Sequence, residues 1–164
     1  MTIHDNPFPN DPDRGELWEM LVRRDIDAFV AGDWSQVEDD FDADRFFAVD
    51  GRASDNPDSW RITPFDAYRV SWLEQSQETN AEVKDVREAL FAATTLRDIE
   101  IVGDDALLHK KFDGTATRHD GSTVVLRWQT VYQCHKRDGR WRITGFIGYL
   151  PNPMGASAEA DQIN

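Results

Sequence analysis

The chain has 164 residues and a formal net charge of −13, with 31 acidic and 18 basic side chains. This charge balance argues against a nucleic-acid partner, because a protein that binds a phosphate backbone needs a basic surface. No apolar run approaches the ~20 residues of a membrane-spanning helix, so we expect no membrane partner. The length is that of one domain with a substantial core.

The two ends of the chain and its single cysteine complete this outline. Residues 1–13 hold three prolines and predict a flexible arm, residues 14–151 form the predicted domain, and residues 152–164 predict a loose tail. The N-terminus lacks the basic and then apolar pattern of a secretory signal. Because Cys134 is the only cysteine, no disulfide can form within the chain, and a cytoplasmic location is expected.

The first predicted helix spans residues 14–31. Asp13 and Glu16 are spaced as in a capping box, in which the first side chain accepts hydrogen bonds from the free N–H groups. Gly32 suits the left-handed position that ends a helix. One face is apolar, with large side chains four, four and three residues apart: Trp18, Val22, Ile26 and Phe29.

Shorter elements follow. We expect a short helix over residues 34–41 with Asp33 as its cap, and a short strand over residues 46–49. The pair Asp50-Gly51 closes that strand.

A second pair of helices comes after a polar loop at residues 52–62. Thr63 is the expected cap of the first one, with Pro64 at its first helical position. A weaker helix is predicted over residues 83–92. The buried face of the first helix of this pair should be Phe65, Tyr68, Trp72 and Ser76.

The rest of the domain predicts four long antiparallel strands. Turn sequences near Gly103, Gly121 and Gly139 separate runs rich in β-branched and aromatic residues. Asp-Gly between such runs is the strongest short-range signal of a hairpin. The strands are expected at residues 94–102, 105–118, 122–137 and 140–150.

Alternation assigns a face to each side chain of the third long strand. Its even-numbered set, which includes Trp128, is the more apolar and should face the core. The opposite face mixes Val125 and Val131 with Arg127 and Gln129. This mixture suits an interface, so a homodimer through the outer face of the sheet is expected.

In the last strand the charge on Arg142 favours the odd-numbered set as the inner one. Gly145 and Gly148 suggest a bulge that curves the sheet. The side chains expected inside are Trp141, Ile143, Ile147 and Tyr149.

This order of elements resembles the NTF2-like (cystatin-like, SnoaL-like) superfamily over about residues 14–151. The sequence Gly-Arg-Trp-Arg-Ile-Thr-Gly-Phe at residues 139–146 looks like the last strand of that superfamily. The resemblance implies an α+β cone, with N-terminal helices packed on a curved antiparallel sheet, a pocket at the open end, and often a homodimer. Its members include isomerases, dehydratases, cyclases, epoxide hydrolases and non-catalytic binding modules, so the fold does not decide the function.

The ketosteroid-isomerase pattern of this superfamily offers a test. Such an enzyme uses an Asp base near the short strand, with a Tyr and a protonated Asp that hold the oxyanion. By position, Asp50 matches the base. The first helix has no Tyr, and the position of the second Asp falls near Trp128, so two of the three roles lack their residue.

Asp50 is therefore the candidate catalytic residue, as a base whose pKa apolar neighbours would raise. The alternative is a structural role, because Asp-Gly is a common turn former. Lys110 lies on an apolar strand face with Leu108 and Phe112. It either anchors an anion in a pocket or packs its stem there while its ammonium reaches solvent.

Large aromatic side chains complete the predicted ligand pocket. They either fill the core or line an apolar site, where an indole N–H can orient a polar atom. The four histidines and Cys134 have no metal-binding spacing, and no phosphate-binding loop is present, so we expect no metal and no cofactor. The pocket candidates, with Lys110, are Trp18, Trp72, Trp128 and Tyr149.

Two functions remain open. In the first, a small pocket binds an apolar or aromatic molecule, with proton transfer, dehydration or hydrolysis at Asp50. In the second, the protein is a non-catalytic dimeric module that uses its sheet for binding or assembly.

Overall fold

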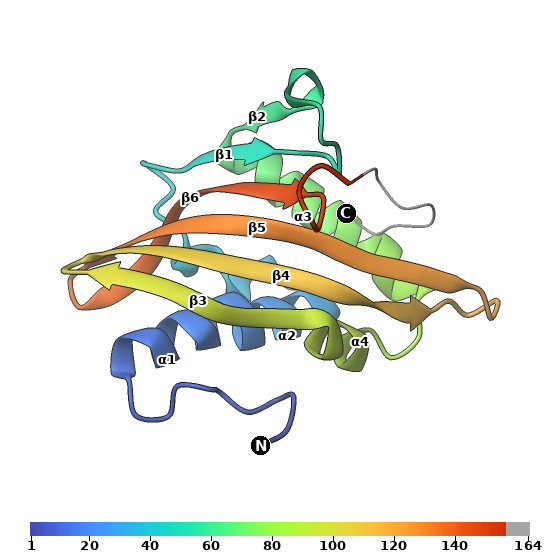
Figure 1. Ribbon diagram of the computed structural model, residues 1–164, viewed down its shortest axis with the longest axis horizontal. Helices are drawn as coiled ribbons and strands as arrows, with labels where there is room; N and C mark the ends of the chain where they lie inside the picture. The colour runs from blue at the N-terminus through green and yellow to red at the C-terminus, as the bar shows by residue number, and fades with distance from the viewer. Residues whose placement is uncertain (157–164) are drawn as a thin grey trace.

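The structure, a computed structural model, describes residues 1–156, in which helices lie on one side of a curved six-stranded sheet (Figure 1). The predicted α+β cone is confirmed. Of the predicted tail, residues 157–164 lie outside the described residues. The helical elements are α1 (Pro12–Trp18), the π-helical segment η1 (Glu19–Arg24), α2 (Asp25–Ala31), the 3₁₀ turns η2 (Trp34–Gln36), η3 (Glu38–Asp40) and η4 (Pro57–Ser59), α3 (Phe65–Glu82) and α4 (Val86–Ala93).

The sheet has the strand order β2-β1-β6-β5-β4-β3. Strands β3 to β6 form the predicted antiparallel meander, whereas β1 runs parallel to β6 and pairs with β2 at the other edge. Strand β2 falls where the sequence predicts a loop. The strands are β1 (Phe47–Asp50), β2 (Arg61–Thr63), β3 (Thr94–Val102), β4 (Asp105–Thr117), β5 (Thr123–Arg137) and β6 (Arg140–Leu150).

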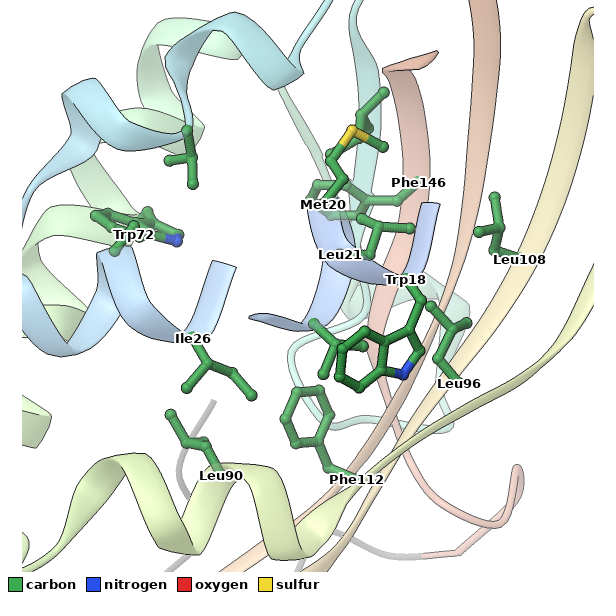
Figure 2. Close-up of a cluster of buried hydrophobic side chains, with 14 of the residues drawn as sticks. Trp18, Met20, Leu21, Ile26, Trp72, Leu90, Leu96, Leu108, Phe112 and Phe146 are labelled. Atoms are coloured by element: carbon green, nitrogen blue, oxygen red, sulfur yellow. The ribbon is translucent and has the colours of Figure 1, made fainter. Parts of the chain in front are cut away.

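One hydrophobic core joins the helices to the inner face of the sheet. In Figure 2, Ile26 of α2 and Leu90 of α4 point toward each other, and Phe112 of β4 lies nearby. Trp72 extends the core to α3. Each of these helices therefore buries one face against the same sheet.

The first helix begins earlier than predicted. Its cap is Asp11, whose carboxylate accepts a hydrogen bond from the Arg14 N–H, and Pro12 takes the first helical position. The predicted cap, Asp13, instead accepts a hydrogen bond from Trp141 Nε1 at 2.9 Å. Asp13 thus ties α1 to the sheet, because it lies within the helix rather than before it.

The π-helical segment η1 fits the wide spacing of the apolar face. Trp18, Val22 and Ile26 advance eight residues, whereas two turns of α-helix take about 7.2. A π-helical turn takes more residues, since its hydrogen bonds join residues five apart. All three side chains are buried. Gly32 ends α2 with φ = +66°, as predicted.

The other helix starts agree with the prediction in part. Asp33 caps η2, as expected. Thr63 ends β2 instead of capping α3, and Pro64 takes the cap position. The carbonyl of Pro64 accepts the hydrogen bond from Tyr68 N–H at 2.9 Å, so this helix starts without a side-chain cap.

The faces of β5 follow the predicted alternation, whereas those of β6 change along the strand. Trp141 is buried as predicted, but Ile147 is 45% exposed and Phe146 is buried in its place. The cause is a bulge, which shifts the register opposite Gln133 and reverses the inner and outer sets.

The predicted N-terminal arm makes specific contacts with α1 and η1. Asn6 Nδ2 donates to the carbonyl of Gly15, and Arg23 donates to the carbonyl of His4. Within residues 1–156, no helix combines the length and the apolar character that crossing a membrane requires.

Candidate functional site

A cavity of about 60 Å³ lies between the helices and the inner face of the sheet. Of the lining residues within 1–156, two are charged, Asp25 of α2 and Lys110 of β4. Three tyrosines, from α3, β5 and β6, also line it. Half of the remaining lining residues are aromatic: Phe29, Trp72, Phe112, Trp128 and Phe146.

Lys110 is the most buried polar side chain of the cavity, at 1% exposure. Its ammonium donates to the carbonyl of Leu21 and to Asp25 Oδ2, the latter at 3.0 Å. It also lies 5.0 Å from the centre of the Phe112 ring. The interpretation in which this ammonium reaches solvent is therefore wrong, because Asp25 and a helix carbonyl replace water around it.

The π-helical segment changes the backbone hydrogen bonding next to Lys110. In a regular α-helix the N–H of Asp25 would donate to the carbonyl of Leu21, four residues back. Here it donates to the carbonyl of Val22. The Leu21 carbonyl is thus available to Lys110, and the end of η1 directs both the carbonyl and the Asp25 carboxylate toward β4.

The three tyrosines of the cavity are hydrogen-bond donors at neutral pH. Burial raises the pKa of Tyr68, Tyr132 and Tyr149 above the ordinary range, and the negative charge of Asp25 raises it further. Tyr68 and Tyr149 lie close enough for each to influence the pKa of the other. All three phenols therefore remain protonated around the carboxylate.

Tyr149 has an unusual backbone conformation at the cavity wall. Its φ is +53°, a left-handed value that is rare for bulky residues and costs about 1–3 kcal/mol. A second bulge between β5 and β6 causes it, with the Tyr149 N–H 3.4 Å from Thr130 Oγ1. The bulge turns the ring into the cavity, so a strained residue contributes to the site.

The aromatic walls are closely packed. The rings of Phe112 and Trp128 stack with their centres 4.1 Å apart and 18° between their planes. On the opposite side, Phe29 and Trp72 meet edge to face at 5.6 Å. Flat apolar surface of this kind favours an aromatic or apolar ligand.

Four of the six residues that the sequence nominates line this one cavity: Trp72, Lys110, Trp128 and Tyr149. The structure does not bring Asp50 and Trp18 into its lining. Trp18 packs on the other side of the first helix, where it lines a separate groove of about 380 Å³ beneath the N-terminal arm.

Asp50 lies at the end of β1, half-buried, near Tyr149. Its Oδ1 accepts a hydrogen bond from the N–H of Arg52 at 2.8 Å, which is the turn geometry of the structural interpretation. Burial nevertheless raises the pKa of this carboxyl, and its charge contributes to the raised pKa of Tyr149. Asp50 thus combines a turn role with a position beside the cavity wall.

Sequence reasoning missed Asp25, Tyr68 as a polar group, and Tyr132. A signal for Asp25 was present, because it lies three residues after Val22 and four before Phe29, on the apolar face of the helix. A carboxylate on such a face and a lysine on an apolar strand face each need a buried partner, and here they find each other.

These groups define what the site can do. Asp25 can accept a hydrogen bond or a proton, the phenols can donate hydrogen bonds, and the rings can hold a flat apolar body. Among residues 1–156, no three His, Cys, Asp or Glu side chains gather into a metal-binding group.

The sequence matches no protein-family profile and no curated protein. Solved structures do match. An NTF2-like protein of unknown function from Silicibacter pomeroyi has a TM-score of 0.57 at 14% identity, over 84% of this chain and 94% of its own. A conserved protein from Planctomyces limnophilus has a TM-score of 0.61 at 13% identity, over 85% and 95%.

A nuclear transport factor 2 (NTF2-like) superfamily protein from Salmonella enterica has a TM-score of 0.55 at 15% identity, over 88% of this chain and 95% of its own. At these identities the likeness concerns the fold alone. The helices on a curved sheet and the length of the matches lead to one conclusion: this chain has the NTF2-like fold.

Proposed function

We propose that the protein binds a small apolar or aromatic molecule in the cavity between its helices and its sheet. The observation that carries the proposal is the lining, which combines stacked aromatic rings with one ion pair and three protonated phenols. Few polar groups in an apolar wall are the usual composition of a ligand site.

The size of the cavity limits the ligand. At about 60 Å³ it is smaller than the roughly 150 Å³ that takes up benzene, so a ring enters only if side chains in the wall move. Leu90 is the aliphatic wall residue of α4. Truncating it in Leu90→Ala should enlarge the cavity and strengthen binding of a ring.

The test is a titration with toluene, followed by NMR of the tryptophan indole N–H groups. The signals of Trp72 and Trp128, which line the cavity, should shift, and that of Trp60 should not. Trp60 is the internal control, because its Nε1 donates to the carbonyl of Ser54 outside the cavity. Equal shifts at all three, or none at saturating toluene with Leu90→Ala, would reject a ligand pocket.

The proposal also includes catalysis, with Asp50 as the residue that takes a proton from the ligand. Its half-buried carboxyl with a raised pKa is suited to taking a proton, and it lies beside Tyr149. Proton transfer can be followed as exchange of the α-hydrogens of a small cyclic ketone in heavy water. Exchange that Asp50→Asn abolishes supports Asp50 as the base, whereas exchange that only Asp25→Asn abolishes assigns the role to Asp25.

A second function, as a dimeric assembly module, is favoured by the outer face of the sheet. A row of apolar side chains crosses four strands there in direct register, Ile62 to Val49, then to Ile147 and Val131. Ile62, Ile147 and Val131 are all exposed. An apolar patch of this extent marks an interface more often than bulk surface.

We propose a second copy of this chain as the occupant of that face. Light scattering of the wild type should give twice the mass of the chain at micromolar concentration, and Ile147→Lys should give the mass of one chain. Val70→Lys is the matched control, because Val70 is an exposed valine on α3, away from the sheet. A monomeric wild type would reject the homodimer.

A further inference from the structure

The two charges of the cavity neutralise each other. Among the described residues that line it, Asp25 and Lys110 are the ionic side chains, and they form a salt bridge. The ammonium of Lys110 also donates a hydrogen bond to the Leu21 carbonyl, so it has two hydrogen-bond acceptors within the protein. The charges inside the wall are therefore balanced before any ligand enters, and the ammonium of Lys110 already has its partners.

An ion would upset this balance. An anion would meet the Asp25 carboxylate without a second cation to pair with, and a cation would meet Lys110 without a second carboxylate. An unpaired charge in an apolar interior is costly, because the lost hydration is not replaced. The lining thus favours a neutral ligand.

One oxygen of Asp25 remains open. Oδ2 accepts from Lys110, whereas Oδ1 accepts no hydrogen bond from any residue in the range 1–156. The side chain of Asp25 is 33% exposed and lines the cavity. A carboxylate oxygen at this position is a ready acceptor for a donor group on a ligand.

The tyrosine of β5 offers the complementary group. The hydroxyl of Tyr132 has no hydrogen-bond partner among the described residues. Tyr132 also lines the cavity. A ligand hydroxyl can donate to a carboxylate and accept from a phenol at the same time, which a hydrocarbon cannot do.

We propose that the cavity selects a neutral aromatic molecule that carries a hydroxyl group. Asp25 Oδ1 accepts a hydrogen bond from this hydroxyl, and Tyr132 donates one to its oxygen. Lys110 positions Asp25. This proposal rests on the ligand pocket of the proposed function and adds the chemical class of the ligand.

The test compares probes of matched shape by NMR titration. Phenol and toluene differ by the hydroxyl, and benzyl alcohol, benzoate and benzylammonium differ by charge. Phenol should bind about tenfold to a hundredfold more tightly than toluene, the range for a hydrogen bond to a charged group. Benzyl alcohol should bind more tightly than both ions.

The double variant Asp25→Asn/Lys110→Met removes both charges together and so leaves neither one unpaired. It should bind toluene as the wild type does, which shows an intact pocket, and lose most of the preference for phenol. Tyr132→Phe should lose part of it.

Each other outcome has a distinct meaning. If phenol and toluene bind equally to the wild type, or if benzoate binds best, the ligand class is wrong and the pocket stands. A preference for phenol that the double variant keeps also overturns the role of Asp25. If no probe binds even in Leu90→Ala, the ligand pocket fails and this inference fails with it.

Discussion

Replacing Asp25 with asparagine should destabilise the fold more than replacing Lys110 with methionine, although both changes break the same ion pair. The reason is the difference in burial, since Lys110 is 1% exposed and the Asp25 side chain 33% exposed. A charge left behind at Lys110 has no water, whereas one left behind at Asp25 keeps part of its hydration.

The expected magnitudes follow from these contacts. Asp25→Asn should cost about 3 kcal/mol, the lower end for breaking a buried pair, because the Leu21 carbonyl still accepts from the ammonium. Lys110→Met should cost about 2 kcal/mol, mainly from the Leu21 carbonyl that loses its donor. The double variant should cost about 2 kcal/mol rather than the sum of about 5 kcal/mol, because it leaves neither charge unpaired although the Leu21 carbonyl still loses its donor.

Urea unfolding at pH 7, followed by tryptophan fluorescence, measures these free energies from the midpoints and a common slope. Asp113→Asn is the control, since it breaks an exposed cross-strand pair with Arg127 and should cost less than about 1 kcal/mol. A larger loss for Lys110→Met than for Asp25→Asn would refute the argument from burial. Strictly additive single effects would refute the coupling.

Three further predictions concern single positions. Gly145→Ala should destabilise the protein by about 3 kcal/mol or more, because the added Cβ would lie 2.0 Å from the carbonyl oxygen of Phe47, and circular dichroism during thermal unfolding measures this. Cys134, which is fully buried with a raised thiol pKa, should resist a thiol reagent until urea unfolds the chain; rapid reaction of the native protein would contradict this. Burial raises the pKa of Asp50 above 3.8, so the folded state binds its proton more tightly and stability is lost as pH rises through that region. Asp50→Asn should therefore stabilise the protein relative to the wild type at pH 7 and have little effect at pH 3, where the carboxyl is protonated in both the folded and the unfolded state. Unfolding experiments at the two pH values test this. If Asp50→Asn destabilises the protein at pH 7 but not at pH 3, the folded state favours the carboxylate and the argument is wrong.

The long strands could be predicted from the sequence because their signals are local. Turn residues such as Gly121 and Gly139 adopt the positive φ that their turns demand, and apolar alternation between them sets the faces of β5. Alternation failed in β6, where one extra residue at a bulge exchanged Ile147 for Phe146. The glycines of this strand indicated a bulge, but its exact position depends on the pairing with β5 and β1.

The candidate site was harder to predict, because its central pair joins residues 85 positions apart. Lys110 was recognised as unusual on its strand, yet its partner lies on a helix where acidic residues are common. The π-helical segment that directs Asp25 toward Lys110 depends on packing against the sheet, and no residue in η1 predicts a π-helix from the sequence. Trp18 was nominated for its size, which carries no information about which side of the helix faces a cavity.

The π-helical segment also sets the rotational phase between the two halves of the first helix. Each residue of an α-helix turns the chain by about 100°, so one residue more or fewer in η1 would turn α2 by that angle relative to α1. Asp13 would still face Trp141, but Asp25 would leave Lys110 and the cavity. Deleting a single residue between Glu19 and Arg24 would therefore act as a change of register, which moves an entire set of side chains without replacing any of them.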